Sequence, residues 1–264
     1  MKLKSFLFPL FLFAVTVSFA QNEPKNKKII KVMTFNIYHG ETMKGDFNLD
    51  VIAKVINDAN PDFVALQEVD HKTNRAKKYD LVTELGIRTK MSSLFAKAMT
   101  FDGGEYGEGI LSRHSLVSSR NVNLPYTKGN EPKNAVEIVS VLPSGDTIAF
   151  VGTHLDYKEN DADRIKQVKK INEVFLKNKY PTIFGGDLNA HPDQNPIKIL
   201  EEKWGTSYDS KNPLFTFPSK QPDRTIDYIM YFPKKRWKVL SKEVIQNSVA
   251  SDHCAYVVTL ELLD

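Results

Sequence analysis

The chain has 264 residues, of which 41% are hydrophobic and 26% are charged, and this composition excludes a disordered or collagen-like protein. Its formal charge of +4 is too small for a protein that binds polyanions indiscriminately. The single cysteine, Cys254, excludes an intramolecular disulfide, a multi-cysteine zinc site and a CxxC redox pair.

The first twenty residues have the pattern of a secretory signal peptide. Lys2 and Lys4 precede an apolar run over residues 6–17, and Ser18-Phe19-Ala20 offers small residues where a signal peptidase cleaves. An uncleaved membrane anchor is the alternative, but the run is shorter than the roughly 20 apolar residues that span a bilayer. We therefore expect residues 1–20 to be removed and the protein to be exported, to the periplasm or outside the cell.

The mature chain would then begin at Gln21 and carry a formal charge of +2, because Lys2 and Lys4 leave with the signal. Residues 21–28 are polar, and we expect them to form a flexible lead-in. Residues 29–264 show no internal repeat, no low-complexity linker and no further stretch apolar enough to span a membrane. They predict one domain, which we expect to act as a monomer.

Beyond residue 28 the sequence alternates β-rich runs with amphipathic helical patterns. The first strand is expected over residues 29–35, and the first helix over residues 49–59 behind Asn48, a residue type that caps helix N-termini. A second helix is expected over residues 79–85, closing on Gly86. Further strands are expected over residues 63–66, 94–99, 109–112, 116–122, 135–142, 147–153, 182–184, 226–232, 237–245 and 256–260, and further helices over residues 161–177 and 196–200. This alternation predicts an α/β domain.

Acids, amides and imidazoles stand at the ends of several predicted strands. They are Asn36, Glu68, His154, Asp187, Asn189, Asp227, Asp252 and His253. One Asp or Asn at such a position most often caps a turn, because its side chain readily bonds its own backbone. Strand ends combine rigid placement with exposure, so the repeated occurrence predicts one assembled site.

The residue types favour a hard divalent cation. The side chains that offer oxygen ligands are Glu68, Asp187, Asp252, Asn36 and Asn189. No cysteine stands among them, so Mg²⁺ or Mn²⁺ suits the set better than zinc. His154 and His253 titrate near neutral pH, and Asp227 can orient His253 by bonding one ring nitrogen. A hard metal, a histidine and a carboxylate can polarise a P–O bond and prepare a water for attack, so hydrolysis of a phosphate ester is the predicted reaction.

The same residues carry a family resemblance. In order along the chain stand Thr34-Phe35-Asn36-Ile37, Gln67-Glu68-Val69, Tyr106-Gly107-Glu108-Gly109-Ile110-Leu111-Ser112, Gly152-Thr153-His154-Leu155, Gly185-Gly186-Asp187-Leu188-Asn189, Thr225-Ile226-Asp227-Tyr228 and Ser251-Asp252-His253. The series resembles the endonuclease/exonuclease/phosphatase superfamily of metal-dependent phosphoesterases and covers nearly all of residues 29–262. The resemblance implies the deoxyribonuclease I-like fold, an α/β (α+β) four-layer sandwich of two packed β-sheets with outer helices and the site at one edge.

The resemblance also implies a metal-binding and a water-binding group. Glu68 is implied as the principal metal ligand, with Asn36 and Asp252 in or near the coordination shell. Asp187 and Asn189 are implied to orient the attacking water and to bind the phosphoryl oxygens.

Two histidines are implied to act at the scissile phosphate. His253, paired with Asp227, is implied as the general base or as a phosphate contact, and His154 as the second histidine. Tyr106 and Glu108 resemble the Tyr-x-Glu of the deoxyribonuclease branch, in which the acid supports the histidine that matches His154. The glycines around this pair fit the beginning of a strand equally well.

Two basic residues are weaker candidates for gripping the substrate. Arg75 follows soon after Glu68 and can bond a phosphate, although an ordinary basic loop explains it equally well. Lys133 stands where family members often place an arginine, and lysine weakens the assignment because it has no bidentate fork. The remaining histidines follow a motif by a few residues, and a surface or satisfied core position explains them better; they are His39, His71, His114 and His191.

The sequence leaves the substrate class open, because nucleic acid, a lipid head group and a phosphorylated sugar or inositol share the scissile unit. The near-neutral charge disfavours a tight DNA binder, but it permits a secreted endonuclease. A sphingomyelinase-like enzyme would need an exposed apolar loop, and residues 99–101 or 214–217 can supply one unless they pack in the core. A catalytically silent binding module on the same fold is the alternative of another class.

Overall fold

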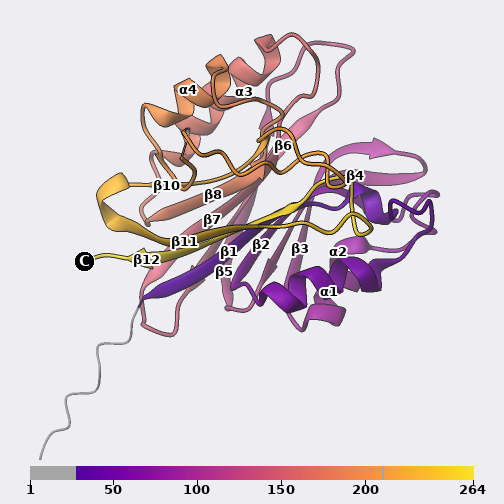
Figure 1. The fold of residues 1–264 in the computed structure, drawn as a ribbon, viewed down its shortest axis with the longest axis horizontal. Coiled ribbons are helices and arrows are strands. Elements are labelled where there is room, and N and C mark those ends of the chain that lie inside the picture. The colour runs from indigo at the N-terminus through magenta and orange to yellow at the C-terminus, as the bar shows by residue number, and fades with distance from the viewer. Residues whose placement is uncertain (1–27, 210) are drawn as a thin grey trace, which may run out of the picture.

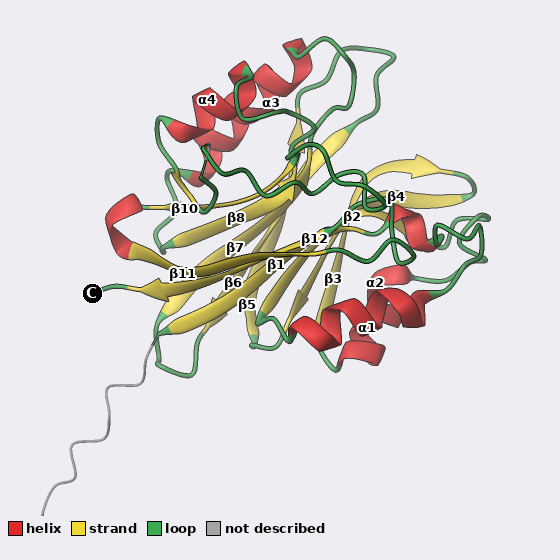
Figure 2. Cartoon of the chain, in the orientation of Figure 1, coloured by secondary structure: helices red, strands yellow, loops and turns green. Residues whose placement is uncertain are grey.

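The computed structural model describes residues 28–209 and 211–264. The predicted signal peptide, residues 1–20, and the predicted lead-in up to residue 27 lie outside the described residues. The described chain forms two six-stranded β-sheets (Figure 1) with helices flanking them (Figure 2). No helix in this part of the chain is long and apolar enough to cross a membrane.

The first sheet has the strand order β11-β12-β1-β2-β4-β3, and the second has the order β5-β6-β7-β8-β10-β9. The strands of the first sheet are β1 (Ile29–Asn36), β2 (Phe63–His71), β3 (Ser92–Phe101), β4 (Gly104–Ser112), β11 (Trp237–Ile245) and β12 (Ala255–Leu262). The strands of the second sheet are β5 (Leu116–Leu124), β6 (Lys133–Val141), β7 (Thr147–His154), β8 (Thr182–Asp187), β9 (Gly205–Thr206) and β10 (Asp227–Phe232).

Three apolar clusters fill the spaces between four layers. The helices are α1 (Leu49–Ala59), α2 (Leu81–Thr89), α3 (Ala162–Phe175) and α4 (Asn195–Glu201), with short 3-10 turns η1 (Tyr38–Gly40) and η2 (Lys234–Arg236). One cluster joins α1 and α2 to the first sheet, and another joins α3 and α4 to the second. The third lies between the sheets and is built on Phe63 and Phe150, whose rings are 5.3 Å apart. The predicted four-layer sandwich is confirmed.

Each of the expected strands and helices is found, with shifts at their ends. Asn48 caps α1 as expected, because its side chain accepts a hydrogen bond from the backbone N–H of Asp50 at 3.1 Å. Strand β2 continues past Glu68 to His71, where the sequence predicted an exit. The short strand β9 was not expected, since two residues are too few for a periodic pattern.

The expectation that the second helix closes on Gly86 is wrong. Helix α2 begins behind Asp80, whose side chain accepts a hydrogen bond from Thr83 N–H, and it runs through Gly86 to Thr89. A Cβ at Gly86 would lie 2.9 Å from the Cβ of Ser93 in β3. The glycine therefore allows the helix to pack closely on the sheet and does not end it.

Parallel pairing brings strand ends to one edge of the sandwich. Strand β1 pairs with β2 in parallel, so Asn36 lies opposite Gln67. Strand β7 pairs with β8 in parallel, so His154 lies opposite Asp187. Strand β10 runs antiparallel to β8 and begins at this edge, where Asp227 lies opposite Asp187. The polar ends of both sheets therefore meet at the same edge.

The alternation of side chains decides which residues face between the sheets. On β1, Ile30 belongs to the inter-sheet cluster, and Asn36 follows it on the same face of the strand. The same alternation places His154, Asp187 and Asp227 on the faces of β7, β8 and β10 that lie toward the other sheet. We call the residues of a strand on this face its inter-sheet row. Each row is apolar along most of its length and becomes polar at this edge.

Small residues let the two sheets approach closely near this edge. A Cβ on Gly152 of β7 would lie 3.2 Å from the Cβ of Ala65 in β2, and one on Gly185 of β8 would lie 3.6 Å from the Cβ of Thr34 in β1. Gly186 serves a different contact, because a Cβ there would lie 2.2 Å from the carbonyl oxygen of Thr153 in the paired strand.

We expect Gly186→Ala to destabilise the protein and Gly185→Ala to be tolerated. The first substitution places a methyl group against a backbone atom of the paired strands β7 and β8. This atom can move away only if the pairing of the two strands breaks. We therefore expect the free energy of unfolding to fall by about 1–3 kcal/mol. The control places its methyl group at an ordinary contact distance of 3.6 Å. Urea unfolding measures both, and equal midpoints for the two variants would contradict the assignment.

Candidate active site

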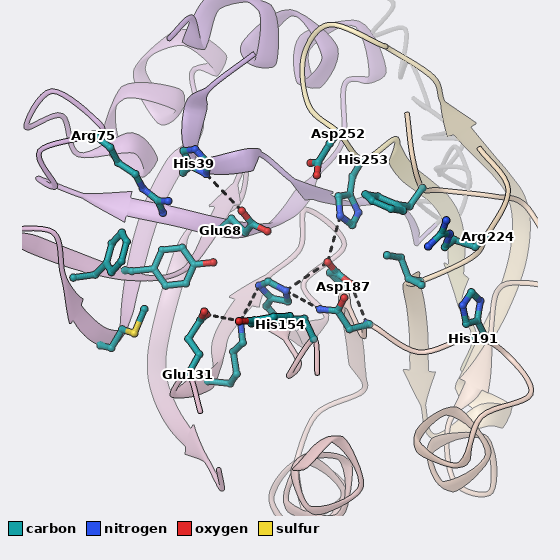
Figure 3. A pocket seen from close by; sticks show the side chains of 18 residues that line it. His39, Glu68, Arg75, Glu131, His154, Asp187, His191, Arg224, Asp252 and His253 are labelled. Atoms are coloured by element: carbon teal, nitrogen blue, oxygen red, sulfur yellow. Dashed lines mark hydrogen bonds and ion pairs between the residues drawn. The ribbon is translucent and has the colours of Figure 1, made fainter. Parts of the chain in front are cut away.

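A pocket of about 500 Å³ opens at the edge where β1, β2, β7 and β8 end (Figure 3). Most of the predicted site residues line it: Glu68, Arg75, Tyr106, Lys133, His154, Asp187, Asn189, Asp252 and His253. Asn36, Glu108 and Asp227 are buried and do not line it. The structure thus collects side chains from both sheets and from the loops beyond them.

Glu68 reaches the pocket because β2 bulges at this residue. The pairing of β2 with β4 shifts register between Leu66 and Val69, and Glu68 has a φ of 56°, in the left-handed region. Such a conformation costs about 1 kcal/mol or more for a residue with a Cβ, and it is typical of functional sites. The Glu68 carboxylate accepts a hydrogen bond from Asn36 Nδ2 at 3.0 Å and lies 3.6 Å from His39 Nδ1.

The neighbours of Glu68 keep its carboxyl group ionised. Burial raises the pKa of Glu68, but the contact with His39, the hydrogen bond from Asn36 and the charge of His253 outweigh burial and lower the pKa to about 2. Glu68 is therefore a carboxylate on the pocket wall at neutral pH, which is the form that a hard cation binds.

Asp187 is the centre of the polar network. Its Oδ2 accepts a hydrogen bond from Asn36 Nδ2 at 3.1 Å and lies 3.5 Å from His154 Nε2 and 3.6 Å from His253 Nε2. The backbone N–H of Asn189 donates to its Oδ1 at 3.0 Å. Burial raises the pKa of Asp187 although the charge of His253 opposes this shift. Asp187 is therefore a better proton acceptor than an exposed carboxylate.

The structure places His253 and Asp227 together. His253 Nδ1 lies 3.0 Å from Asp227 Oδ2, and the ring of Phe217 covers the imidazole with 4.7 Å between ring centroids. Burial lowers the pKa of His253, but the charges of Asp227 and Asp187 outweigh it and raise the pKa to about 10. His253 is therefore an imidazolium at neutral pH in this protein. It suits a phosphate contact or a proton donor better than a general base.

His154 is in the opposite protonation state. Its Nδ1 lies 3.4 Å from Lys133 Nζ, and its Nε2 lies 2.9 Å from Asn189 Nδ2. Burial and the charge of Lys133 hold the pKa of His154 well below its usual range. The pocket therefore contains one neutral and one charged imidazole on either side of Asp187, which lets the two act differently on one phosphate.

The expectation that Glu108 supports His154 is wrong. Glu108 is fully buried in β4, and neither of its carboxyl oxygens has a hydrogen-bond partner. Burial raises the pKa of Glu108 well above its usual range, which favours the neutral acid. Lys133, at the start of β6, occupies the place beside His154 Nδ1 instead. Tyr106 does line the pocket, two residues before Glu108 on the same strand.

The two basic candidates are both held by acids. Arg75 lines the pocket, but its Nε and Nη2 donate to Asp70 at 2.7 and 2.9 Å, so only one edge of the guanidinium is free. Lys133 is buried, and its Nζ donates to Glu131 Oε1 at 2.6 Å. Lys133 has no bidentate fork to offer a phosphate, and Arg75 keeps only its Nη1–Nη2 edge for one.

The site offers oxygen and nitrogen ligands without any thiolate. Glu68 and Asp252 both line the pocket, where Figure 3 labels them. Asn36 differs from its expected role, because its Oδ1 accepts the backbone N–H of Tyr38 at 3.1 Å while its Nδ2 faces Glu68. In this geometry Asn36 orients the carboxylate. The carboxylates that remain on the pocket wall fit a hard divalent cation.

A second group near the pocket could also hold a metal ion. Asp187, Asp227 and His253 each bring one ligand atom within 4.8 Å of the others, and all three are buried. The hydrogen bond between His253 and Asp227 uses one ring nitrogen and one carboxylate oxygen, and Asp227 Oδ1 has no hydrogen-bond partner. Glu68 is a partly exposed carboxylate on the pocket wall, with 24% of its side chain accessible.

Other lining residues carried little signal in the sequence. His39 and His191 line the pocket, whereas His71 and His114 do not. Tyr157 also lines it and was missed, although its place three residues after His154 could have suggested it. Lone histidines and tyrosines occur on every protein surface, so only neighbours in space separate the useful ones from the rest.

The profile of the Endonuclease/Exonuclease/phosphatase family matches residues 33–253. The chain belongs to this family. Its members are generally phosphoesterases or nucleases, and they typically depend on a divalent metal. The family motifs of this chain supply the pocket residues described above, from Glu68 near the beginning of the match to His253 at its end.

Solved structures share the fold of this family protein at low sequence identity. An endonuclease/exonuclease/phosphatase from Beutenbergia cavernae has a TM-score of 0.73 and 21% identity, with 90% of this chain and 72% of that chain covered. The human Nocturnin catalytic domain with bound sulfate has a TM-score of 0.70 and 22% identity, with 89% and 95% covered. A mannosyl-6-phosphatase from Bacteroides thetaiotaomicron has a TM-score of 0.70 and 16% identity, with 88% and 99% covered. These likenesses show the deoxyribonuclease I-like fold.

We expect His253 to stabilise the metal-free protein in a pH-dependent way. Because its folded pKa of about 10 exceeds the ordinary value of about 6.5, its contribution is complete below pH 6.5 and is lost as the pH rises toward 10. The stability advantage of the wild type over Asp227→Asn should therefore shrink over this range. Thermal unfolding in EDTA measures it, and an advantage that does not change with pH would contradict the pairing. Nitrogen NMR should also find His253 doubly protonated at pH 8.

Proposed function

We propose that this protein is an exported, divalent-metal-dependent hydrolase of phosphate esters that acts as a monomer. The observation that carries the proposal is the convergence of one ionised carboxylate, one charged imidazole and one neutral imidazole around Asp187 in a single pocket. The family membership supports a phosphoesterase over a silent binding module, because the chain keeps the acids and imidazoles that the reaction needs.

Glu68 and Asp252 would hold the metal ion, with Asn36 fixing Glu68. Their oxygen donors favour Mg²⁺ or Mn²⁺ over softer ions. When bound there, a divalent ion would polarise the phosphoryl group and stabilise the negative charge that develops in the transition state. Because Glu68 is ionised at neutral pH, protons do not compete with the ion there.

The residues around the phosphate divide the remaining work. The charged imidazole of His253 donates a hydrogen bond to a phosphoryl oxygen, and Asp227 keeps it charged and oriented. Asp187 accepts a proton from the attacking water, since burial makes it more basic than an exposed carboxylate. Asn189 and the neutral His154 bind the phosphoryl oxygens from the other side.

Three substrate classes fit this chemistry. A secreted endonuclease would act on DNA or RNA, a sphingomyelinase-like enzyme on a phospholipid head group, and a phosphatase on a phosphorylated sugar or inositol. The pocket of about 500 Å³ is of the size that encloses a small ligand, and this favours a soluble phosphate ester over duplex DNA. Phe215 is the exposed large apolar residue of the loop 214–217, and one such side chain is a weak membrane contact.

We expect the mature protein to hydrolyse bis(p-nitrophenyl) phosphate or p-nitrophenyl phosphate with Mg²⁺ and to lose this activity in EDTA. Glu68→Gln and Asp187→Ala should each lower kcat/KM by at least about a hundredfold, because each removes a group that acts in the transition state. Release of p-nitrophenol gives the rates, and plasmid DNA and sphingomyelin under the same Mg²⁺ condition test the other substrate classes.

The matched control for these variants is Asp193→Ala, which removes an exposed aspartate that does not line the pocket. It should retain wild-type activity. Hydrolysis that continues in EDTA, or that survives both pocket substitutions, would refute the proposed function.

We expect the exported protein to begin at Gln21. Expression of the full chain in a bacterial host, followed by fractionation and intact-mass measurement, locates the cleavage site. Leu12→Arg breaks the apolar run over residues 6–17 and should keep the protein uncleaved in the cytoplasm. Export of this variant, or retention of residues 1–20 in the exported wild type, would contradict the signal peptide.

A further inference from the structure

Four phenylalanine and tyrosine rings line the pocket, each with a cation over one face, and the three that are not fully buried form what we call the outer wall. These three are Phe101, Tyr157 and Phe217. Arg75 lies 4.6 Å from the ring centroid of Phe101, Lys158 lies 4.8 Å from that of Tyr157, and Arg224 lies 5.3 Å from that of Phe217. The rings come from β3, from the loop after β7 and from the loop before β10, so three separate segments build this wall.

The two arginines at this wall are each paired with an aspartate. Arg75 donates through Nε and Nη2 to Asp70, and Arg224 donates through Nε to Asp223 at 2.8 Å. A ligand rich in hydroxyl groups needs several free donors and acceptors at fixed positions. What this wall presents instead is ring faces and guanidinium planes, and these bind flat groups by stacking.

Tyr157 is the most accessible of the three rings. It is 55% exposed, whereas Phe101 and Phe217 are half-buried. Lys158 Nζ lies over one face of the Tyr157 ring. The tyrosine is thus a pocket side chain that remains accessible to a ligand.

The backbone on both sides of Tyr157 is fixed by buried side chains of α3. Arg164, 2% exposed, donates through Nη1 to the carbonyl oxygens of Asp156 and Lys158. The backbone N–H of Asp156 donates to Gln167 Oε1 at 3.0 Å. A loop held in this way presents its aromatic ring at little entropic cost when a ligand binds.

We infer that Tyr157 determines specificity by stacking on a planar ring that the substrate carries next to its phosphate. This inference rests on the proposed function, because it takes the phosphate to lie between His154 and His253. The ring would be a nucleobase or an aryl group, since both present the flat face that an aromatic side chain needs. A pocket of about 500 Å³ accommodates a molecule of mononucleotide size.

The test compares adenosine 5′-monophosphate with ribose 5-phosphate, which lacks only the base. Binding is measured by calorimetry with Mg²⁺, in an Asp187→Asn background that prevents turnover. The nucleotide should bind at least about tenfold more tightly, the range of one stacked base. Tyr157→Ala should reduce this preference to less than about threefold, and Tyr157→Phe should keep it because the ring remains.

The matched control is Tyr126→Ala, which removes another exposed tyrosine, one that does not line the pocket. It should leave the preference unchanged. Phenyl phosphate tells whether the site takes any aryl ring or only a nucleobase. If phenyl phosphate binds as tightly as the nucleotide, the site accepts any aryl group. If it binds only as tightly as ribose 5-phosphate, the site requires a nucleobase. Any of three results would overturn the inference. The nucleotide and ribose 5-phosphate bind with equal affinity, or glucose 6-phosphate binds more tightly than the nucleotide, or Tyr157→Ala lowers the affinity for the nucleotide and for ribose 5-phosphate by the same factor.

Failure of this inference can be told apart from failure of the proposed function. If the protein releases p-nitrophenol in the presence of Mg²⁺ but binds the nucleotide no more tightly than ribose 5-phosphate, the role of Tyr157 is refuted and the phosphoesterase activity stands. A preference for the ring in a protein that hydrolyses none of the esters keeps the stacking site and removes the enzyme.

Discussion

The two β-sheets of this protein approach each other closely at one edge, and the site depends on that approach. Gly152 and Gly185 leave room for Ala65 and Thr34 of the opposite sheet. Just beyond them, Asn36 of the first sheet donates to Asp187 of the second at 3.1 Å. Side chains larger than alanine in these rows would separate the sheets and break this bridge, so the packing of the core fixes the geometry of the site.

The acids and imidazoles at this edge are stable there because they are paired. Burying an isolated charge costs several kcal/mol, and a partner with good geometry offsets much of that cost. Asp227 stabilises a charged His253, whereas Lys133 disfavours a charge on His154. The same edge therefore contains two histidines whose pKa values are shifted in opposite directions by their different surroundings. The aromatic residues Phe101, Tyr157 and Phe217 line the same pocket.

Sequence alone predicted the fold and most of the residues that meet in the pocket. Apolar residues alternate along the strands with a period of two, and this indicates which face of each strand is buried between the sheets. A polar residue that ends such a row, such as Asn36 or Asp187, must lie beside the other rows at the same edge. The ordered motifs carried the same information for Glu68 and His253, because their spacing matches that of a known family.

Only the tertiary structure decided which charged groups are partners. The family resemblance suggested Glu108 as a support for His154, but β6 brings Lys133 to that place and leaves Glu108 buried without a hydrogen-bond partner. The sequence also could not show that the guanidinium of Arg75 donates to the carboxylate of Asp70. Periodicity and local motifs fix the face on which a side chain lies. Which neighbour it meets depends on how strands far apart in sequence are packed, and a difference of a few ångströms there decides both the partner and the protonation state.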